Sequence, residues 1–267
     1  MKKSNIIILL LTILGLLTSC SSFTDCEKIE DRQLFILVDL SDKQLFEVIE
    51  SDINQNFANF MQTTKLGEVQ PCQQFTLSMA HFGGKDELEI SSKSIAITKK
   101  GLSYEEEKEL ANPLPLKNFM SQKIAEYKGL TSDSLVTSRT NIANVLVKTI
   151  NQSEVESQNT FLLFTDGIEN NDYVNLYRAI PGENEISDVV RRIVEPSVLD
   201  RFLKLKEAGL QCKIIMVLKP DLQRQGDSRA IQSFWINVFN ELGLECQFID
   251  NLSNKVDLSA QQELVPN

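Results

Sequence analysis

Residues 33–43 read QLFILVDLSDK, and this stretch decides the fold. Its apolar residues run without a break from Leu34 to Val38, which is typical of a strand covered on both faces, as in parallel sheets. Residues 44–61 follow with apolar side chains at helical spacing. A buried strand that leads directly into a helix indicates an α/β fold.

The same alternation continues to the end of the chain, which predicts one α/β domain with a doubly wound, mostly parallel sheet and helices on both faces. One strand, within 87–98, alternates apolar and polar residues and is expected at an antiparallel edge. Ligands of such sheets bind at the carboxyl ends of the strands. The other expected strands cover 74–82, 160–164, 212–218 and 244–249, and the helices 104–110, 116–127, 141–150, 186–194, 196–208 and 229–242.

The N-terminus is that of an exported protein. Two lysines precede an apolar run from Ile6 to Leu17, which is shorter than the roughly 20 residues of a membrane-spanning helix. The run ends in Leu17-Thr18-Ser19-Cys20, which resembles the lipobox of bacterial lipoproteins. The resemblance implies that residues 1–19 are a signal peptide and that Cys20 is lipidated.

Charge limits the partners. The full chain carries 27 basic and 37 acidic residues, and removal of 1–19 takes away two lysines, so the net charge changes from −10 to −12. This balance argues against nucleic acid and against adhesion to anionic lipid. The lipid on Cys20 is then the expected membrane attachment, at the end of a tether over 20–32. The residue after Cys20 is Ser21 and not the aspartate that retains enteric lipoproteins at the inner membrane, which favours the outer membrane.

Polar residues follow two of the buried strands and begin one helix. The first strand runs into Asp39-Leu40-Ser41-Asp42-Lys43, the strand at 160–164 runs into Thr165-Asp166-Gly167, and Ser138-Arg139-Thr140-Asn141-Ile142 begins the helix between them. In this order the three segments resemble the von Willebrand factor A (VWA) domain, where they form a metal-ion-dependent adhesion site. The resemblance covers 33–253 and implies a Rossmann-like sheet with insertions near 99–137 and 169–195 and a flexible tail at 254–267.

The resemblance implies that Mg²⁺ is held by Asp39, Ser41, Thr140 and Asp166. These residues supply the hard oxygen ligands that Mg²⁺ prefers. In the family an acidic residue of another protein often completes the metal shell, so the implied partner is a protein at the cell envelope and the implied role is binding, not catalysis.

Lys43 stands where the family has its second serine, and an ammonium has no lone pair to offer a metal. An inward Lys43 would repel Mg²⁺ and pair with Asp39 and Asp166 in its place, giving a metal-free scaffold. An outward Lys43 would leave room for a water in the shell. Nearby acidic side chains offer further oxygens, and they are Asp42, Glu169 and Asp172.

Enzyme motifs are absent from the sequence. There is no Gly-x-Ser-x-Gly elbow, no glycine-rich phosphate loop, and a single histidine, His81. An apolar strand that ends in Asp also resembles the start of haloacid-dehalogenase-like phosphatases, but Ser41 stands in place of their second aspartate, the general acid. A phosphatase is therefore the weaker alternative to a binding domain.

Four cysteines follow Cys20, and an even count in an exported chain suggests disulfides. There is no Cys-x-x-Cys motif, which argues against redox chemistry. In the VWA arrangement the strands that the cysteines precede are neighbours, which implies the pairs Cys26–Cys72 and Cys212–Cys246. Free buried thiols are the alternative.

Overall fold

The computed structural model describes residues 24–83, 88–132, 140–219, 228–254 and 256. The predicted signal peptide, Cys20 and most of the predicted tail lie outside this range. Within it, no helix is long and apolar enough to cross a membrane.

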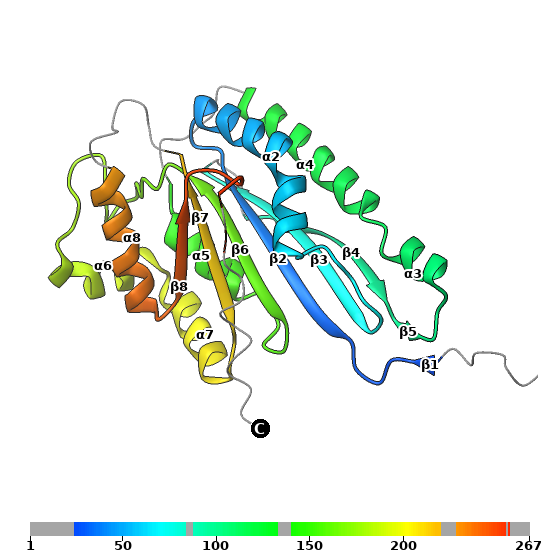
Figure 1. Ribbon diagram of the computed structural model, residues 1–267. Coiled ribbons are helices and arrows are strands. Elements are labelled where there is room, and N and C mark those ends of the chain that lie inside the picture. Colours follow the sequence, from blue (N-terminus) through cyan, green and yellow to red (C-terminus); the bar gives the residue numbers. More distant parts are fainter. Residues whose placement is uncertain (1–23, 84–87, 133–139, 220–227, 255, 257–267) are drawn as a thin grey trace, which may run out of the picture.

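A six-stranded sheet in the order β4-β3-β2-β6-β7-β8 forms the centre of the molecule (Figure 1). All neighbouring strands are parallel except β4, which runs antiparallel to β3 at one edge. The Rossmann-like, mostly parallel fold expected from the sequence is confirmed. The strands are β2 (Glu30–Asp39), β3 (Gln73–Phe82), β4 (Ser91–Ile97), β6 (Gln158–Thr165), β7 (Cys212–Leu218) and β8 (Glu245–Ile249).

Helices cover both faces of this sheet. One apolar core lies between the sheet and α2 with α4, and the other lies between the sheet and α5 to α8. Because both faces of β2 are covered, Leu34 to Val38 are all buried, as the apolar run predicts. The helices are α2 (Lys43–Thr64), α3 (Tyr104–Leu110), α4 (Leu114–Ser132), α5 (Ile142–Ile150), α6 (Ile186–Ile193), α7 (Pro196–Glu207) and α8 (Ser228–Leu242), with a 3₁₀ turn at Glu183–Glu185.

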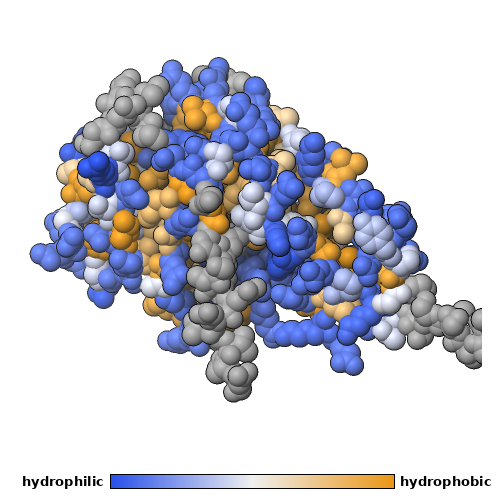
Figure 2. Space-filling model, in the orientation of Figure 1, coloured by the Kyte–Doolittle hydropathy of each residue, from blue (hydrophilic) through white to orange (hydrophobic). Residues whose placement is uncertain are grey.

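The surface seen in Figure 2 is mostly hydrophilic, with hydrophobic residues showing between the polar ones in small groups. This agrees with a core that is held inside two layers of helices. The helix α4 contributes to that core through Leu116, Met120, Ile124 and Tyr127, so this part of the predicted insertion covers the sheet.

Two short strands form a second sheet that the sequence pattern does not reveal. β1 (Thr24–Asp25) pairs antiparallel with β5 (Lys99–Lys100). Next to this pair, Cys26 and Cys72 form a disulfide with their Cα atoms 5.5 Å apart. This agrees with the pairing implied by the VWA resemblance, and it joins the segment before β2 to the start of β3.

The second expected disulfide is wrong, because Cys212 and Cys246 are free. The register of the sheet explains the error: Cys246 lies opposite Ile214, two residues along β7 from Cys212. Two residues of strand span roughly 6–7 Å, which is too far for a disulfide between neighbouring strands. Burial raises the pKa of the Cys212 thiol to about 11 and that of Cys246 further, so both stay protonated at neutral pH.

Candidate metal-binding edge of the sheet

Asp39 joins the ends of two central strands. It is the last residue of β2, and its side chain is fully buried. One carboxylate oxygen, Oδ1, accepts a hydrogen bond from the backbone N–H of Ser41 at 2.9 Å, and Oδ2 accepts from the hydroxyl of Thr165, at the end of β6, at 2.7 Å. Burial raises the pKa of Asp39, and the bonds from Ser41 and Thr165 oppose that rise.

Thr140 and Asp166 are tied to the same loop after β6. The backbone of Thr140 exchanges two hydrogen bonds of 3.0 Å with Asn170, and its hydroxyl donates to the carbonyl oxygen of Ile168. The half-buried Asp166 accepts at Oδ1 from the N–H of Ile168 at 2.8 Å. Since Asp39 holds Ser41 and also Thr165, the neighbour of Asp166, the structure brings all four predicted ligands to one edge of the sheet.

Lys43 lies outside this cluster. It is the first residue of α2 and is exposed, and it forms no ion pair with any residue that the structure describes. The preceding Asp42 caps the helix, because its Oδ1 accepts from the N–H of Leu45 at 2.8 Å. Of the two arrangements left open by the sequence, the structure has the outward one.

Glu169 is a second buried carboxylate near Asp39, and the sequence marked it only as a neighbour of the motif. Its Oε2 accepts from the backbone N–H groups of Ile142 at 2.8 Å and Ala143 at 3.2 Å, in the first turn of α5, and its Oε1 accepts from Asn171 at 2.5 Å. Burial is the main cause that raises the pKa of Glu169 to about 8, and the negative charge of Asp39 adds to it.

Close packing fixes the backbone at this edge. Gly83, just after β3, has φ of +83°, and a Cβ there would lie 2.8 Å from Asp39 Oδ1 and 2.7 Å from the Ser41 nitrogen. On the other side of the cluster, the indole nitrogen of the buried Trp235 donates to the Gly167 carbonyl at 2.7 Å. Only a glycine fits at position 83, and the hydrogen bond from Trp235 to Gly167 holds the turn after Asp166.

The donor set at this edge fits a hard divalent cation. It consists of two carboxylates and two hydroxyls, all oxygen donors. Neither Asp39 nor Glu169 forms an ion pair with any basic side chain that the structure describes, and the two buried acids lie close enough for the charge of Asp39 to raise the pKa of Glu169. The described residues contain no group of three or more His, Cys, Asp or Glu placed to hold a metal, so the hydroxyls would have to be ligands too.

Comparisons with known proteins find distant structural likenesses and no matching family. No family model matches the chain, and no curated protein is significantly similar to it. Similar solved structures include proximal thread matrix protein 1 from the mussel byssus (12% identity, 85% of this chain and 46% of that chain, TM-score 0.34), of which another structure has a zinc-occupied MIDAS motif.

Two further solved structures are similar to this chain, at comparable identity and TM-score. They are manganese-loaded TRAP protein from Plasmodium vivax (12% identity, 79% of this chain and 65% of that chain, TM-score 0.32) and the pilus adhesin SpaC from Lactobacillus rhamnosus GG in its open conformation (12%, 86% and 29%, 0.36). The chain spans less than half the length of the byssus protein. At these identities and TM-scores the likeness assigns neither a family nor a function, so function has to be argued from the residues of this chain.

Proposed function

We propose that this chain is an envelope lipoprotein whose VWA-like domain binds a partner protein through a divalent cation at the carboxyl edge of its sheet. The observation that carries the proposal is the fully buried carboxylate of Asp39, which has the buried Glu169 near it and no basic side chain paired to it among the described residues. A buried charge without a partner is costly, and a bound cation offsets that cost.

Mg²⁺ is the cation that we propose, and its ligands are Asp39, Ser41, Thr140 and Asp166. Its chemical contribution is to let a carboxylate of the partner complete the coordination shell. The chain holds the ligands in place: Thr165 orients Asp39, the Ile168 carbonyl accepts from the Thr140 hydroxyl, and the N–H of Ile168 orients Asp166. Because Lys43 is exposed at the start of α2, its ammonium does not occupy the place of the cation.

The loop after Glu169 offers a contact surface next to this edge. Tyr173 is 68% exposed and Tyr177 is 43% exposed, and Tyr173 lines a shallow pocket together with Arg178. The loop has a defined shape, because Asn171 Oδ1 accepts from the N–H of Tyr173 at 2.9 Å. Tyr and Arg are enriched among the residues that dominate binding energy at protein interfaces, so this loop suits a protein partner.

Titration calorimetry with Mg²⁺ and with Mn²⁺ tests the metal site directly. We expect heat of binding in the chelator-treated protein, and its loss in Asp39→Asn. Asp200→Asn, at an exposed position of α7, is the matched control and should bind like the unaltered protein. If neither cation binds to the folded, unaltered protein, the metal site is refuted and the domain is a metal-free scaffold.

The membrane anchor needs a separate test in cells. Since the domain carries a strong negative charge, its attachment should depend on Cys20 alone. We expect Cys20→Ala to move the protein from the membrane fraction to the soluble fraction, and mass spectrometry of the unaltered protein to show acyl chains on Cys20. Fractionation of outer and inner membranes then tests the proposed outer-membrane location. Retention of Cys20→Ala on the membrane would refute lipid anchoring.

A further inference from the structure

One face of the sheet becomes polar where β3 pairs with β4. The residues of β3 that face α2 and α4 are apolar, and they are Phe75, Leu77 and Met79. On the opposite face, β3 has Thr76 and Ser78, and β4 places Ser94 and Ser92 directly opposite them. The hydroxyls of Ser78 and Ser92 lie 2.8 Å apart, and those of Thr76 and Ser94 lie 2.9 Å apart. This produces a band of paired hydroxyl groups at the margin of the sheet, where Ser78 is buried and Ser92 and Ser94 are exposed.

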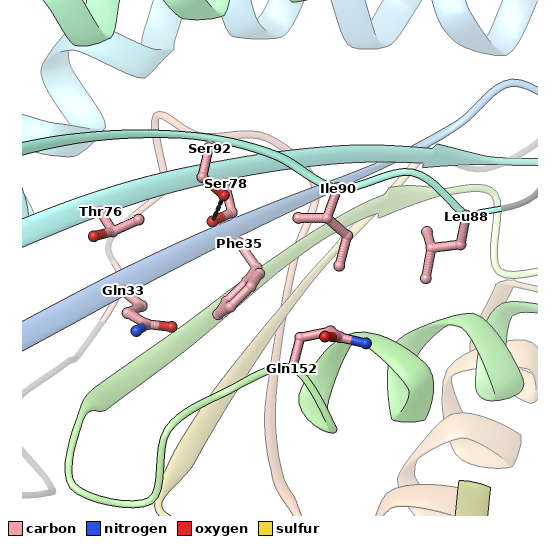
Figure 3. Close-up of a pocket in the computed structure, with 8 residues that line it drawn as sticks. All are labelled: Gln33, Phe35, Thr76, Ser78, Leu88, Ile90, Ser92 and Gln152. Atoms are coloured by element: carbon pink, nitrogen blue, oxygen red, sulfur yellow. Dashed lines mark hydrogen bonds between the residues drawn. The ribbon is translucent and has the colours of Figure 1, made fainter.

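A cavity of about 480 Å³ lies over this band. Its floor comes from β2, β3 and β4, one wall comes from the segment before β4, and the other comes from the turn after α5 (Figure 3). Figure 3 shows the side chain of Ile90 reaching over the sheet toward that turn. The lining residues are Gln33, Phe35, Thr76, Ser78, Leu88, Ile90, Ser92 and Gln152.

The lining combines neutral hydrogen-bonding groups with an apolar side. None of its residues is ionisable, and carboxamides and hydroxyls supply both donors and acceptors. Phe35, Leu88 and Ile90 form the apolar part and pack against the core. A charged ligand would find no counter-charge in this lining, and a wholly apolar ligand would cover the carboxamides and hydroxyls without forming hydrogen bonds to them.

A hydrogen bond holds the side-chain carboxamide of Gln33 in one orientation. Its amide nitrogen donates to Asp31 Oδ2 at 2.6 Å, and the Ser157 hydroxyl donates to the same oxygen at 3.1 Å. This fixes the carboxamide plane, and in Figure 3 its oxygen points toward the cavity and its nitrogen points away. The acceptor of Gln33 is therefore oriented before any ligand arrives, which lowers the entropic cost of binding.

From these features we infer that the cavity is a binding site for a neutral saccharide unit. A sugar ring presents hydroxyls at its edges and C–H groups on its faces, which matches a carboxamide and hydroxyl floor beside an apolar wall. The hydroxyl floor of this cavity is set back from the proposed metal site, because Ser78 and Thr76 lie four and six residues before Phe82 at the carboxyl end of β3, about 13–20 Å along the strand. The inference therefore does not rest on the proposed function.

Saturation-transfer NMR with N,N′-diacetylchitobiose, cellobiose and maltose tests this inference on a chain produced without residues 1–19, so that it carries no lipid. We expect transfer to the ring protons of at least one disaccharide, in the presence of chelator as well. Glucose 6-phosphate is the charged comparison and should show less. Absence of transfer to all three disaccharides, or stronger transfer to the charged sugar, would overturn the inference.

Gln33→Met and Gln152→Met test which residues bind. Each variant preserves side-chain length and removes one hydrogen-bonding group, so we expect affinity for the disaccharide to fall about three- to tenfold in each. Gln55→Met on the exposed face of α2 is the control and should bind normally. Circular dichroism and the thermal midpoint identify a variant that fails to fold, and the two variants lie on different elements. Unchanged affinity in both folded variants would place the sugar elsewhere and overturn the inference.

Discussion

Lys219 and Asp52 form a buried ion pair, with the ammonium nitrogen 2.6 Å from Asp52 Oδ2. Lys219 directly follows β7 and Asp52 lies on α2, so the pair joins the sheet to its covering helix. The same ammonium donates to the Asp250 carbonyl at 2.6 Å, and Asp52 also accepts from the N–H of Leu252. The pair thereby fastens the chain after β8 against α2.

Removal of one partner of this pair should destabilise the fold. Asp52→Ala leaves the Lys219 ammonium buried without a counter-charge, and we expect a loss of about 3–5 kcal/mol in the free energy of unfolding. The measurement is denaturant unfolding followed by circular dichroism. Lys28→Met breaks the exposed ion pair with Glu156 and is the control, with an expected change below about 1 kcal/mol. Equal small effects in both variants would contradict a structural role for the buried pair.

Gly83→Ala should damage the proposed metal site specifically. A methyl group there would contact Asp39 Oδ1 and the Ser41 nitrogen, and the positive φ adds strain, so we expect a loss of about 1–3 kcal/mol and weaker Mg²⁺ binding. The control is Gly129→Ala within α4, where a Cβ has open space and helix propensity rises, so stability should increase by about 0.5–1 kcal/mol. Normal Mg²⁺ binding by Gly83→Ala would argue against a site at this position.

Glu169 predicts how stability depends on pH in the chelator-treated protein. Its pKa rises from an ordinary value of 4.5 to about 8 on folding, so between these values the folded chain binds more protons than the unfolded chain. Stability contributed by the protonated group is therefore fully present below about pH 4.5 and is lost as the pH rises through about 8. Asp39, whose pKa is also raised, acts in the same sense.

Unfolding curves measured across that pH window check this prediction. Glu169→Gln should flatten the decline, because the amide oxygen can still accept from the first turn of α5 and no charge is buried. Glu106→Gln is the control, since the capping bond from Ser103 lowers the pKa of Glu106 and places its effect below the window. A decline of the same slope in Glu169→Gln would show that other groups cause it.

The disulfide is testable by counting thiols. In the unfolded, unreduced mature chain with Cys20 replaced by Ser, alkylation should modify Cys212 and Cys246 only, and reduction should add Cys26 and Cys72. Replacement of Cys26 and Cys72 together by Ser should cost about 2–4 kcal/mol, measured by denaturant unfolding. If no thiol reacted in the unreduced chain, Cys212 and Cys246 would have to be disulfide-bonded, which would contradict the register of β7 and β8.

Most of the fold could be predicted because its signals are local. The run from Leu34 to Val38 and the helical spacing that follows lie in contiguous sequence, and their bounds differ from the structure by a few residues. The differences lie at the ends of helices. The helix α4 begins at Leu114 and includes Pro115, because a residue in the first turn of a helix does not need the backbone N–H that proline lacks. Two-residue strands such as β1 carry no pattern to detect.

The order of the motifs along the chain predicts which residues lie at the site, but not how the side chains around them are oriented. Asp39 ends one strand and Asp166 follows its parallel neighbour, so both lie at one edge of the sheet, and Thr140 joins that edge through its bridge to Asn170. The direction of Lys43 depends on where α2 starts, which is set by the capping bond of Asp42 and not by the residue type at position 43. The bonds of Glu169 to the first turn of α5 span 26 and 27 residues, so no local pattern announces them.

The disulfide between Cys26 and Cys72 also governs how the domain responds to mechanical load. If the chain is held at residue 20, tension passes the two-residue strand β1 and reaches Cys26, where it divides between the polypeptide leading to β2 and the covalent bridge leading to β3. Because β2 and β3 are parallel and in register from Glu30 and Gln73, both are pulled from the same end. Rupture then requires shearing two central strands out of the sheet together, instead of unzipping one strand bond by bond.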